Sequence, residues 1–463
     1  MIKRTVWMGL CLAVAALVVA AQEGPIVIKL SSGERAVLAA PDFRGAGDAQ
    51  QYMNVFNQTL WRDLESSGLY SMASKSFYPL QTPQRPEDFR RPVTPSQPAR
   101  RGAPPPQPVS QGPWLTDWSG PPVKATYLAF GYTAPQGDQI VLRGWLYNVT
   151  QADTANAQVL GKVYLAPMGE EGARKVAHDF ATDILKQFGG VSLVGSKIYF
   201  VSTRGGRRSK ELWSMDPDGA NQKQITRYGT ISFTPAVSPD GMRLAFTTFQ
   251  PGNPAIFVFS LETGRRLPFY SPVSSVTTTP EFTPDGQHIL FASAIGGWTQ
   301  IFSANPDGSG LRRISYVSTT EVEPKVNPKT GSEMVFVSGR SGTPQIYRMN
   351  MEGADVTRLT TGEGDAVNPA WRPDGQHIAF AWTRGFAPGN YNIFVMDVAT
   401  RQVNQLTHGA GRNENPSWAP DGLHIVFSSN RSGSTQIWTM LADGTQLQQL
   451  TTQGLNSMPV WSK

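Results

Sequence analysis

Cysteine is almost absent from this sequence of 463 residues, since the only one is Cys11, close to the N-terminus. The rest of the chain therefore forms no disulfide and no cysteine-based metal site. Charge is also sparse: charged side chains make up 16% of the residues, and the net charge is +6. Such a modest charge argues against nucleic-acid binding.

Long apolar runs are missing after the first residues, so the sequence predicts no membrane-spanning helix there. The N-terminus itself reads MIKRTVWMGLCLAVAALVVAAQEG, in which Lys3 and Arg4 precede a short apolar run and small residues precede Gln22. This order is typical of a secretory signal peptide. We therefore predict that residues 1–21 are a signal that is removed on export.

Glycine (45 residues) and proline (36 residues) are abundant, and they recur in one phrase. The phrase is a Pro-Asp-Gly turn followed by alternating apolar and polar residues, as in RPDGQHIAFAW from Arg372. A longer variant, NPKTGSEMVFVS, begins at Asn327. The turn aspartates are spaced at multiples of about 45 residues, the period of a propeller blade; they are Asp240, Asp285, Asp374 and Asp421.

Each repeat has the same internal order, which indicates four short strands. Five repeats open with a strand that contains proline, and a sixth, Ser196 to Thr226, lacks this first strand. The last residues, SMPVWSK, match the missing strand, so Met458 to Ser462 are expected to close the ring non-covalently. The sequence thus predicts a six-bladed β-propeller over residues 191–463.

The region before the propeller has a different character and predicts a small N-terminal α/β domain over residues 22–190. Two segments keep helical spacing: one carries Met53, Phe56, Leu60 and Leu64, and the other runs from Ala173 to Phe188. Lys124 to Thr150 is typical of a hairpin. The insertion Gln81 to Pro113 is rich in proline, and we expect it to be a mobile loop that does not pack.

No catalytic motif stands out, so we expect a protein that is not an enzyme and has no cofactor. The sequence has no Gly-x-Ser-x-Gly elbow of a hydrolase. His288, His377 and His424 occupy equivalent places in separate repeats, which does not favour a shared metal, and we expect these side chains to face solvent. The turn aspartates lack calcium-loop spacing, and we interpret them as structural.

Binding is then expected on the face where each first strand begins. The loops between second and third strands share this face and carry Arg204, Arg340, Arg384 and Arg431. Polar residues near the opening prolines lie there too, among them Asn368 and Asn415. The arginines either pair with neighbouring acids or contribute to a surface of mixed charge that suits a folded protein partner.

The whole pattern resembles the TolB family, the periplasmic propellers of the Tol-Pal system. The resemblance is carried by the signal peptide, the domain order, LWRDLESSGLY (residues 60–70) and the final PVWS strand. The sequence departs from the family pattern in the length of the insertion at 81–113 and in the NPKTG turn. The resemblance implies a monomeric, periplasmic, non-catalytic adaptor for envelope integrity and cell division.

Two partners follow from this resemblance, with other outer-membrane or peptidoglycan-associated proteins as further ones. Segments before the opening prolines contact the lipoprotein Pal in the family, and Glu323 is expected to be exposed there. In the family, the mature N-terminus binds TolA by adding a strand to its sheet. The alternative interpretation of this segment is an edge strand of the α/β domain. The Pal-like residues are Thr279, Val322, Glu323, Asn368, Asn415, Arg340 and Arg431, and the TolA-like ones are Ile26, Val27, Ile28 and Leu30.

A second hypothesis remains open on the residues alone. A propeller of this kind can bind or cleave a peptide or a glycan in its central channel. The two hypotheses differ in one observation, because the channel-binding protein would not retain Pal from envelope extracts.

Overall fold

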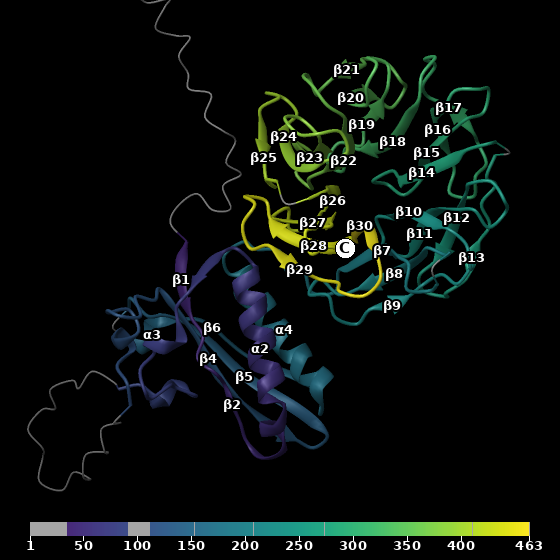
Figure 1. Ribbon diagram of the computed structural model, residues 1–463. Helices are drawn as coiled ribbons and strands as arrows, with labels where there is room; N and C mark the ends of the chain where they lie inside the picture. Colours follow the sequence, from purple (N-terminus) through teal and green to yellow (C-terminus); the bar gives the residue numbers. More distant parts are fainter. Residues whose placement is uncertain are drawn as a thin grey trace, which may run out of the picture.

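The structure is a computed structural model that describes residues 35–90, 112–151, 153–206, 208–272, 274–409 and 411–462. Figure 1 shows two parts: a small sheet with helices, in purple and blue, lies beside a ring of sheets coloured from teal to yellow. The prediction of a small α/β region followed by a six-bladed propeller is confirmed. Within the described ranges, no helix is both long and apolar enough to cross a membrane.

The α/β part contains one sheet with the strand order β3-β1-β4-β5-β6, and β2 pairs with β4. β1 runs parallel to β3 and β4, whereas β4, β5 and β6 form an antiparallel meander. The strands are β1 (Ala36–Ala39), β2 (Arg44–Gly45), β3 (Tyr70–Met72), β4 (Tyr127–Gln136), β5 (Gln139–Asn148) and β6 (Gln158–Pro167). The predicted hairpin is thus β4 and β5.

Two longer helices, α2 (Met53–Ser66) and α4 (Glu170–Lys186), pack against each other and against this sheet. The apolar residues that predicted α2 are all buried, and the second predicted helix begins three residues earlier than expected. Gly189 has a φ of +72° just after α4 and provides the expected stop. The short helical turns are η1 (Gly47–Tyr52), η2 (Lys75–Phe77), η3 (Pro86–Asp88), η4 (Leu115–Asp117) and α3 (Thr154–Ala157).

The expectation that the proline-rich insertion does not pack is wrong for its first ten residues. Phe89 is buried and its ring meets that of Phe130 edge-on at 5.4 Å. The backbone N–H of Arg90 donates to the carbonyl of Pro113 at 3.1 Å, which joins the first ten residues of the insertion to its last residue. Apolar burial at Phe89 therefore anchors the insertion to the sheet. Residues 91–111 lie outside the described residues.

The propeller consists of six four-stranded antiparallel sheets, numbered here as blades 1 to 6. Blade 1 is β30 (Asn456–Ser462), β7 (Lys197–Ser202), β8 (Glu211–Met215) and β9 (Lys223–Gln224). Blade 2 is β10 (Ser232–Val237), β11 (Arg243–Thr248), β12 (Ala255–Ser260) and β13 (Arg266–Leu267). Blade 3 is β14 (Thr277–Phe282), β15 (Ile289–Ser293), β16 (Gln300–Ala304) and β17 (Arg312–Arg313). Blade 4 is β18 (Glu321–Val326), β19 (Glu333–Ser338), β20 (Gln345–Asn350) and β21 (Thr357–Arg358). Blade 5 is β22 (Ala366–Trp371), β23 (His377–Trp382), β24 (Asn392–Asp397) and β25 (Val403–Gln405). Blade 6 is β26 (Asn413–Trp418), β27 (His424–Ser429), β28 (Gln436–Leu441) and β29 (Gln448–Gln449).

Closure of the ring by the C-terminus is confirmed, because β30 is the innermost strand of blade 1 and pairs antiparallel with β7. In Figure 1, β30 (yellow) lies directly beside β7 (teal). The indole Nε1 of Trp461 donates to Ser196 Oγ at 2.9 Å, on the far side of the closure. The last strand therefore joins the two ends of the ring and covers an otherwise open sheet edge.

The turns between first and second strands have the predicted chemistry. Each turn aspartate accepts the backbone N–H two residues later, as Asp374 does from Gln376 at 2.8 Å. The following glycine is left-handed, with a φ of +68° at Gly375, where a side chain is strained. The structural interpretation of the aspartates is confirmed by equivalent bonds at Asp240, Asp285 and Asp421.

The expectation for the turn histidines holds only in part. His288 is exposed as expected, and His377 is half-buried. His424 is buried, with 6% of its surface exposed, because the end of α2 covers blade 6 at that turn. The three positions share one motif, and in blade 6 the end of α2 packs over it.

Candidate functional site

The mouth face is defined here as the side of the propeller where the first strands begin and the loops from second to third strands lie. In blade 4, for example, Glu321 at the start of β18 pairs with Ser338 at the end of β19. The contacts of α2 with the propeller lie instead at the turn that carries His424 and at turns between third and fourth strands, as at Asp218. The described residues of the α/β part therefore leave the mouth of the central channel accessible.

A cavity of about 400 Å³ occupies the channel and is lined by the first strands of all six blades. Six equivalent residues stand directly before the opening prolines on these strands, and all have left-handed backbone conformations with φ between +46° and +55°. None of them is glycine, so each conformation costs on the order of 1–3 kcal/mol and is held by its surroundings. They are Thr234, Thr279, Glu323, Asn368, Asn415 and Met458; this set is called the channel ring below.

Hydrogen bonds between neighbouring blades hold part of the channel ring. The N–H of Glu323 donates to Thr279 Oγ1 at 3.2 Å, and the N–H of Asn368 donates to Glu323 Oε2 at 2.6 Å. The N–H of Asn415 then donates to Asn368 Oδ1 at 3.3 Å. Each of these side chains thus accepts a backbone N–H of the next blade, which the β-bulge there leaves without a partner in the pairing of first and second strands. Four of the predicted partner-binding residues therefore form one connected set.

The expectation that Glu323 is freely exposed is wrong. Its side chain lines the channel, and its second oxygen, Oε1, accepts the Nδ2–H of Asn368 at 2.9 Å. Burial raises the pKa of the Glu323 carboxyl, an effect that the bonds from Asn368 and the positive charge of Lys325 oppose. Lys325 itself pairs with Glu281 of the preceding blade, Nζ to Oε2 at 2.6 Å. Glu323 is therefore a structural member of the channel ring as well as a channel-lining carboxylate.

The arginines on the mouth face are held more firmly than free surface charges. Arg340 forms an ion pair with Glu321, whose side chain is completely buried, and its guanidinium lies 4.9 Å from the ring centre of Tyr347. Arg431 donates to Asn413 Oδ1 at 2.7 Å and lies over Trp438. Part of each arginine therefore fixes the start of a first strand, as the ion-pair interpretation expected for Arg340. Arg384 remains exposed on this face.

Not every predicted residue falls in the channel ring. Val322 precedes Glu323 on β18, is half-buried, and does not line the cavity. The TolA-like residues at 26–30 and the predicted signal at 1–21 lie outside the described residues. Sequence reasoning missed Thr234 and Met458, although both stand before an opening proline in the same way as Glu323. That shared position was the signal that could have identified them.

The channel offers polar groups but little chemistry for catalysis. Across the parts of the chain that the structure describes, no group of three or more His, Cys, Asp or Glu side chains could hold a metal ion. Three carboxylates of the first strands have protein partners: Glu321 with Arg340, Glu281 with Lys325, and Glu323 with Asn368. The arrangement provides a rigid, polar rim around a cavity, which suits recognition of another molecule.

Comparison with known proteins gives consistent results. The protein called "Protein TolB homolog" from Chlorobium chlorochromatii (strain CaD3) is 36% identical over 208 residues, 44% of this chain and 44% of the relative. The "Tol-Pal system protein TolB" from Ruegeria sp. (strain TM1040) is 30% identical over 267 residues, 56% of this chain and 53% of the relative. The matched region thus spans about half the length of these curated relatives.

A solved structure shares the complete arrangement. The crystal structure of TolB from Acinetobacter baumannii superimposes with a TM-score of 0.73 over 93% of this chain and 97% of that chain, at 22% sequence identity. The family described as "TolB beta propeller domain" matches residues 185–368 and 361–463, more than half of the chain. The chain therefore belongs to the TolB beta-propeller family.

Proposed function

We propose that this protein is a non-catalytic adaptor of the Tol-Pal system in the periplasm, and that it binds Pal through the mouth face of its propeller. Membership of the TolB family supports the system, and the names of its relatives include "Tol-Pal system protein TolB". The observation that carries the site is the channel ring, in which Thr279, Glu323, Asn368 and Asn415 are fixed before any partner arrives. A preorganised rim reduces the conformational cost of binding.

The position of the α/β part supports the same surface. It contacts the propeller at turns away from the mouth, so a folded partner meets no obstruction from α2. The segment that contains Ile26, Val27, Ile28 and Leu30 is proposed to bind TolA by strand addition. Two partners on separate surfaces make the chain a link between the inner and the outer membrane, in support of envelope integrity and cell division.

The test is a substitution that introduces a charge at the mouth face and leaves every residue of the channel ring unchanged. Val322 is half-buried and next to Glu323, so Val322→Lys should weaken binding of the organism's own Pal domain by tenfold or more, about 1.4 kcal/mol. Val163 on β6, 47% exposed, provides the matched control Val163→Lys, which should leave the affinity unchanged. Titration calorimetry measures both, and thermal melting verifies that each variant is folded.

The outcomes separate the two hypotheses. Equal affinity for Pal in wild type and Val322→Lys would remove the mouth face from the interface. A wild-type protein that does not bind Pal, but retains a peptide or a glycan, would favour the channel-binding hypothesis. For the second partner, Ile28→Asp should abolish capture of TolA without changing the affinity for Pal.

A further inference from the structure

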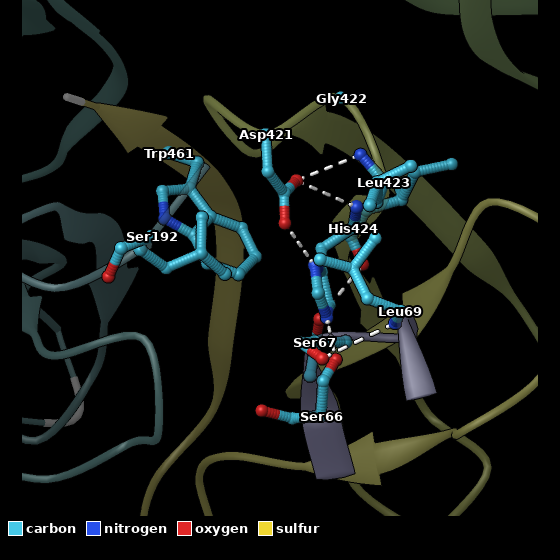
Figure 2. A network of polar contacts seen from close by, with 12 residues as sticks. Ser66, Ser67, Leu69, Ser192, Asp421, Gly422, Leu423, His424 and Trp461 are labelled. Carbon is cyan, nitrogen blue, oxygen red and sulfur yellow. Dashed lines mark hydrogen bonds and ion pairs between the residues drawn. The ribbon is translucent and has the colours of Figure 1, made fainter. Parts of the chain in front are cut away.

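A buried histidine joins the propeller to the α/β part. His424, at the start of β27 in blade 6, lies between Asp421 of its own turn and the C-terminal end of α2 (Figure 2). Its Nδ1 is 2.6 Å from Asp421 Oδ2, and its Nε2 is 2.6 Å from the backbone carbonyl oxygen of Ser66. The side chains of His424 and Asp421 are 7% and 3% exposed. Both side chains are therefore almost completely buried.

The two partners of the ring are both acceptors. The carbonyl of Ser66 can only accept, and it is one of the last carbonyls of α2, which have no partner within the helix. The other oxygen of Asp421, Oδ1, accepts the backbone N–H groups of Leu423 at 2.8 Å and of His424 at 3.1 Å, which is the pattern of an ionised carboxylate. Both ring nitrogens must then carry hydrogen, so the geometry requires an imidazolium. A neutral ring has one N–H and loses one of the two bonds.

The same motif in other blades shows what is special about this one. In blade 5, His377 Nδ1 lies 2.8 Å from Asp374 Oδ2, but its Nε2 faces no helix carbonyl and is 3.9 Å from Asp397. In blade 3, His288 is exposed. Only in blade 6, among the described residues, does a turn histidine reach α2. The link between proton binding and the helix therefore comes from the contact between the two parts of the chain.

Several other charged groups around this junction have partners, and Glu65 of α2 is exposed to solvent. On α2, Asp63 contacts Nδ1 of His178 from α4, and Arg62 pairs with Asp218 from blade 1. Arg174 of α4 approaches the same Asp218 at 3.7 Å.

On the propeller side, Lys197 pairs with Asp216, and the ring of Trp461 from β30 lies 6.2 Å from that of His424. A cavity of about 290 Å³ separates the two parts here. Among the described residues, Asp421 is the acidic side chain that contacts His424, and the C-terminal end of α2 adds to its effect.

The direction of the pKa agrees with this geometry. Burial opposes the charged ring, but the hydrogen bond and the charge of Asp421, together with the Ser66 carbonyl, raise the pKa of His424 above its usual value. A raised folded-state pKa gives stabilisation that is complete below the unfolded value of about 6.5 and is lost as pH rises through the folded value. The junction is therefore strongest in mildly acidic solution.

We propose that His424 is a proton-binding site that couples pH to the docking of α2 on the propeller. With the proton bound, the imidazolium bridges Asp421 and the C-terminal end of α2. When the proton is lost, one of the two bonds breaks, and the end of α2 detaches more often. The proposal concerns the junction between the two parts and does not depend on any partner.

Hydrogen exchange of the intact mature chain tests this coupling. Protection of the amides at 63–69, corrected for intrinsic rates, should fall about tenfold between about pH 5.5 and about pH 8.5, the effect of losing one charged hydrogen bond. His424→Gln should remove this step and show weak protection at both pH values. His377→Gln, with the same turn motif away from α2, and His178→Gln, with the other imidazole near α2, should retain the step.

Two results would overturn the proposal. One is a wild-type protein whose protection at 63–69 does not change with pH. The other is a pH step that survives in His424→Gln or disappears in His178→Gln. Should His424→Gln fail to fold, proton NMR of the wild-type imidazoles decides, because the His424 ring must titrate above the usual histidine value of about 6.5. An equal or lower midpoint contradicts the coupling.

Discussion

Removal of the Glu323 side chain should destabilise the propeller through the bonds it accepts, and not through its charge. In Glu323→Ala, the N–H and the Nδ2–H of Asn368 lose their acceptors, which lie at 2.6 and 2.9 Å in the wild type. An orphaned buried donor costs about 1–3 kcal/mol. The Asn368 side chain can turn toward other groups, whereas its backbone N–H cannot, so we expect a loss of about 2–4 kcal/mol.

Glu323→Gln separates charge from shape, because the amide oxygen still accepts the Asn368 N–H, and only the Nδ2–H of Asn368, whose side chain can turn, loses its acceptor. Burial raises the pKa of Glu323, so the ionised form is disfavoured in the folded protein. A raised carboxyl pKa means stabilisation that is present below the unfolded value of about 4.5 and lost as pH increases through the folded value. Glu323→Gln should therefore stay within about 1 kcal/mol of wild type at neutral pH and lack this pH-dependent loss.

Urea unfolding between mildly acidic and neutral pH measures both variants. Glu262 lies exposed between β12 and β13, so Glu262→Ala is the matched control and should change stability by less than about 0.5 kcal/mol. If Glu323→Ala is as stable as this control, the channel ring does not depend on the bonds to Asn368. If Glu323→Gln is as unstable as Glu323→Ala, the charge, and not the acceptor, holds the ring.

Three further changes address other parts of the structure. Arg340→Met leaves the buried carboxylate of Glu321 without its ion pair, so it should cost about 3–5 kcal/mol in urea unfolding, and the second change Glu321→Gln should restore most of the loss. Deletion of 458–463 removes most of β30 from its pairing with β7 and should lower the melting temperature and promote aggregation; removal of Lys463 alone should do neither. Burial opposes the charge of Asp374, but bonds from His377 and Gln376 lower its pKa to about 2. The ionised Asp374 carboxylate therefore stabilises the fold above its unfolded pKa, and this stabilisation is lost as pH falls toward 2. Asp374→Ala should lower the free energy of unfolding by about 1–2 kcal/mol at pH 7, allowing for solvent screening, and should be as stable as wild type near pH 2.

Local chemistry explains why much of the fold could be predicted from the sequence. A Pro-Asp-Gly turn needs an Asx acceptor and a left-handed glycine, and both requirements are met by adjacent residues such as Asp374 and Gly375. The spacing of Phe56, Leu60 and Leu64 alone places one face of α2 in the core. The repeat also revealed the closing strand, because a blade without its first strand implies that another segment supplies it.

The surroundings of each site were decided only by tertiary structure. Glu323 and Asn368 are 45 positions apart, so nothing local shows that one carboxylate accepts from the other's backbone and is thereby withdrawn from solvent. The proline-rich insertion looked unable to pack, yet Phe89 finds a place beneath the sheet that composition cannot reveal.

The turn histidines show the same division most directly. The sequence determines that His288, His377 and His424 follow equivalent turns, because the same Pro-Asp-Gly motif precedes each of them. Tertiary structure determines that only His424 is buried, because α2 ends above blade 6 and brings the Ser66 carbonyl to its ring. Burial and hydrogen-bond partners depend on segments hundreds of residues away, and these decide whether a histidine is a solvent-facing side chain or a buried, charged bridge.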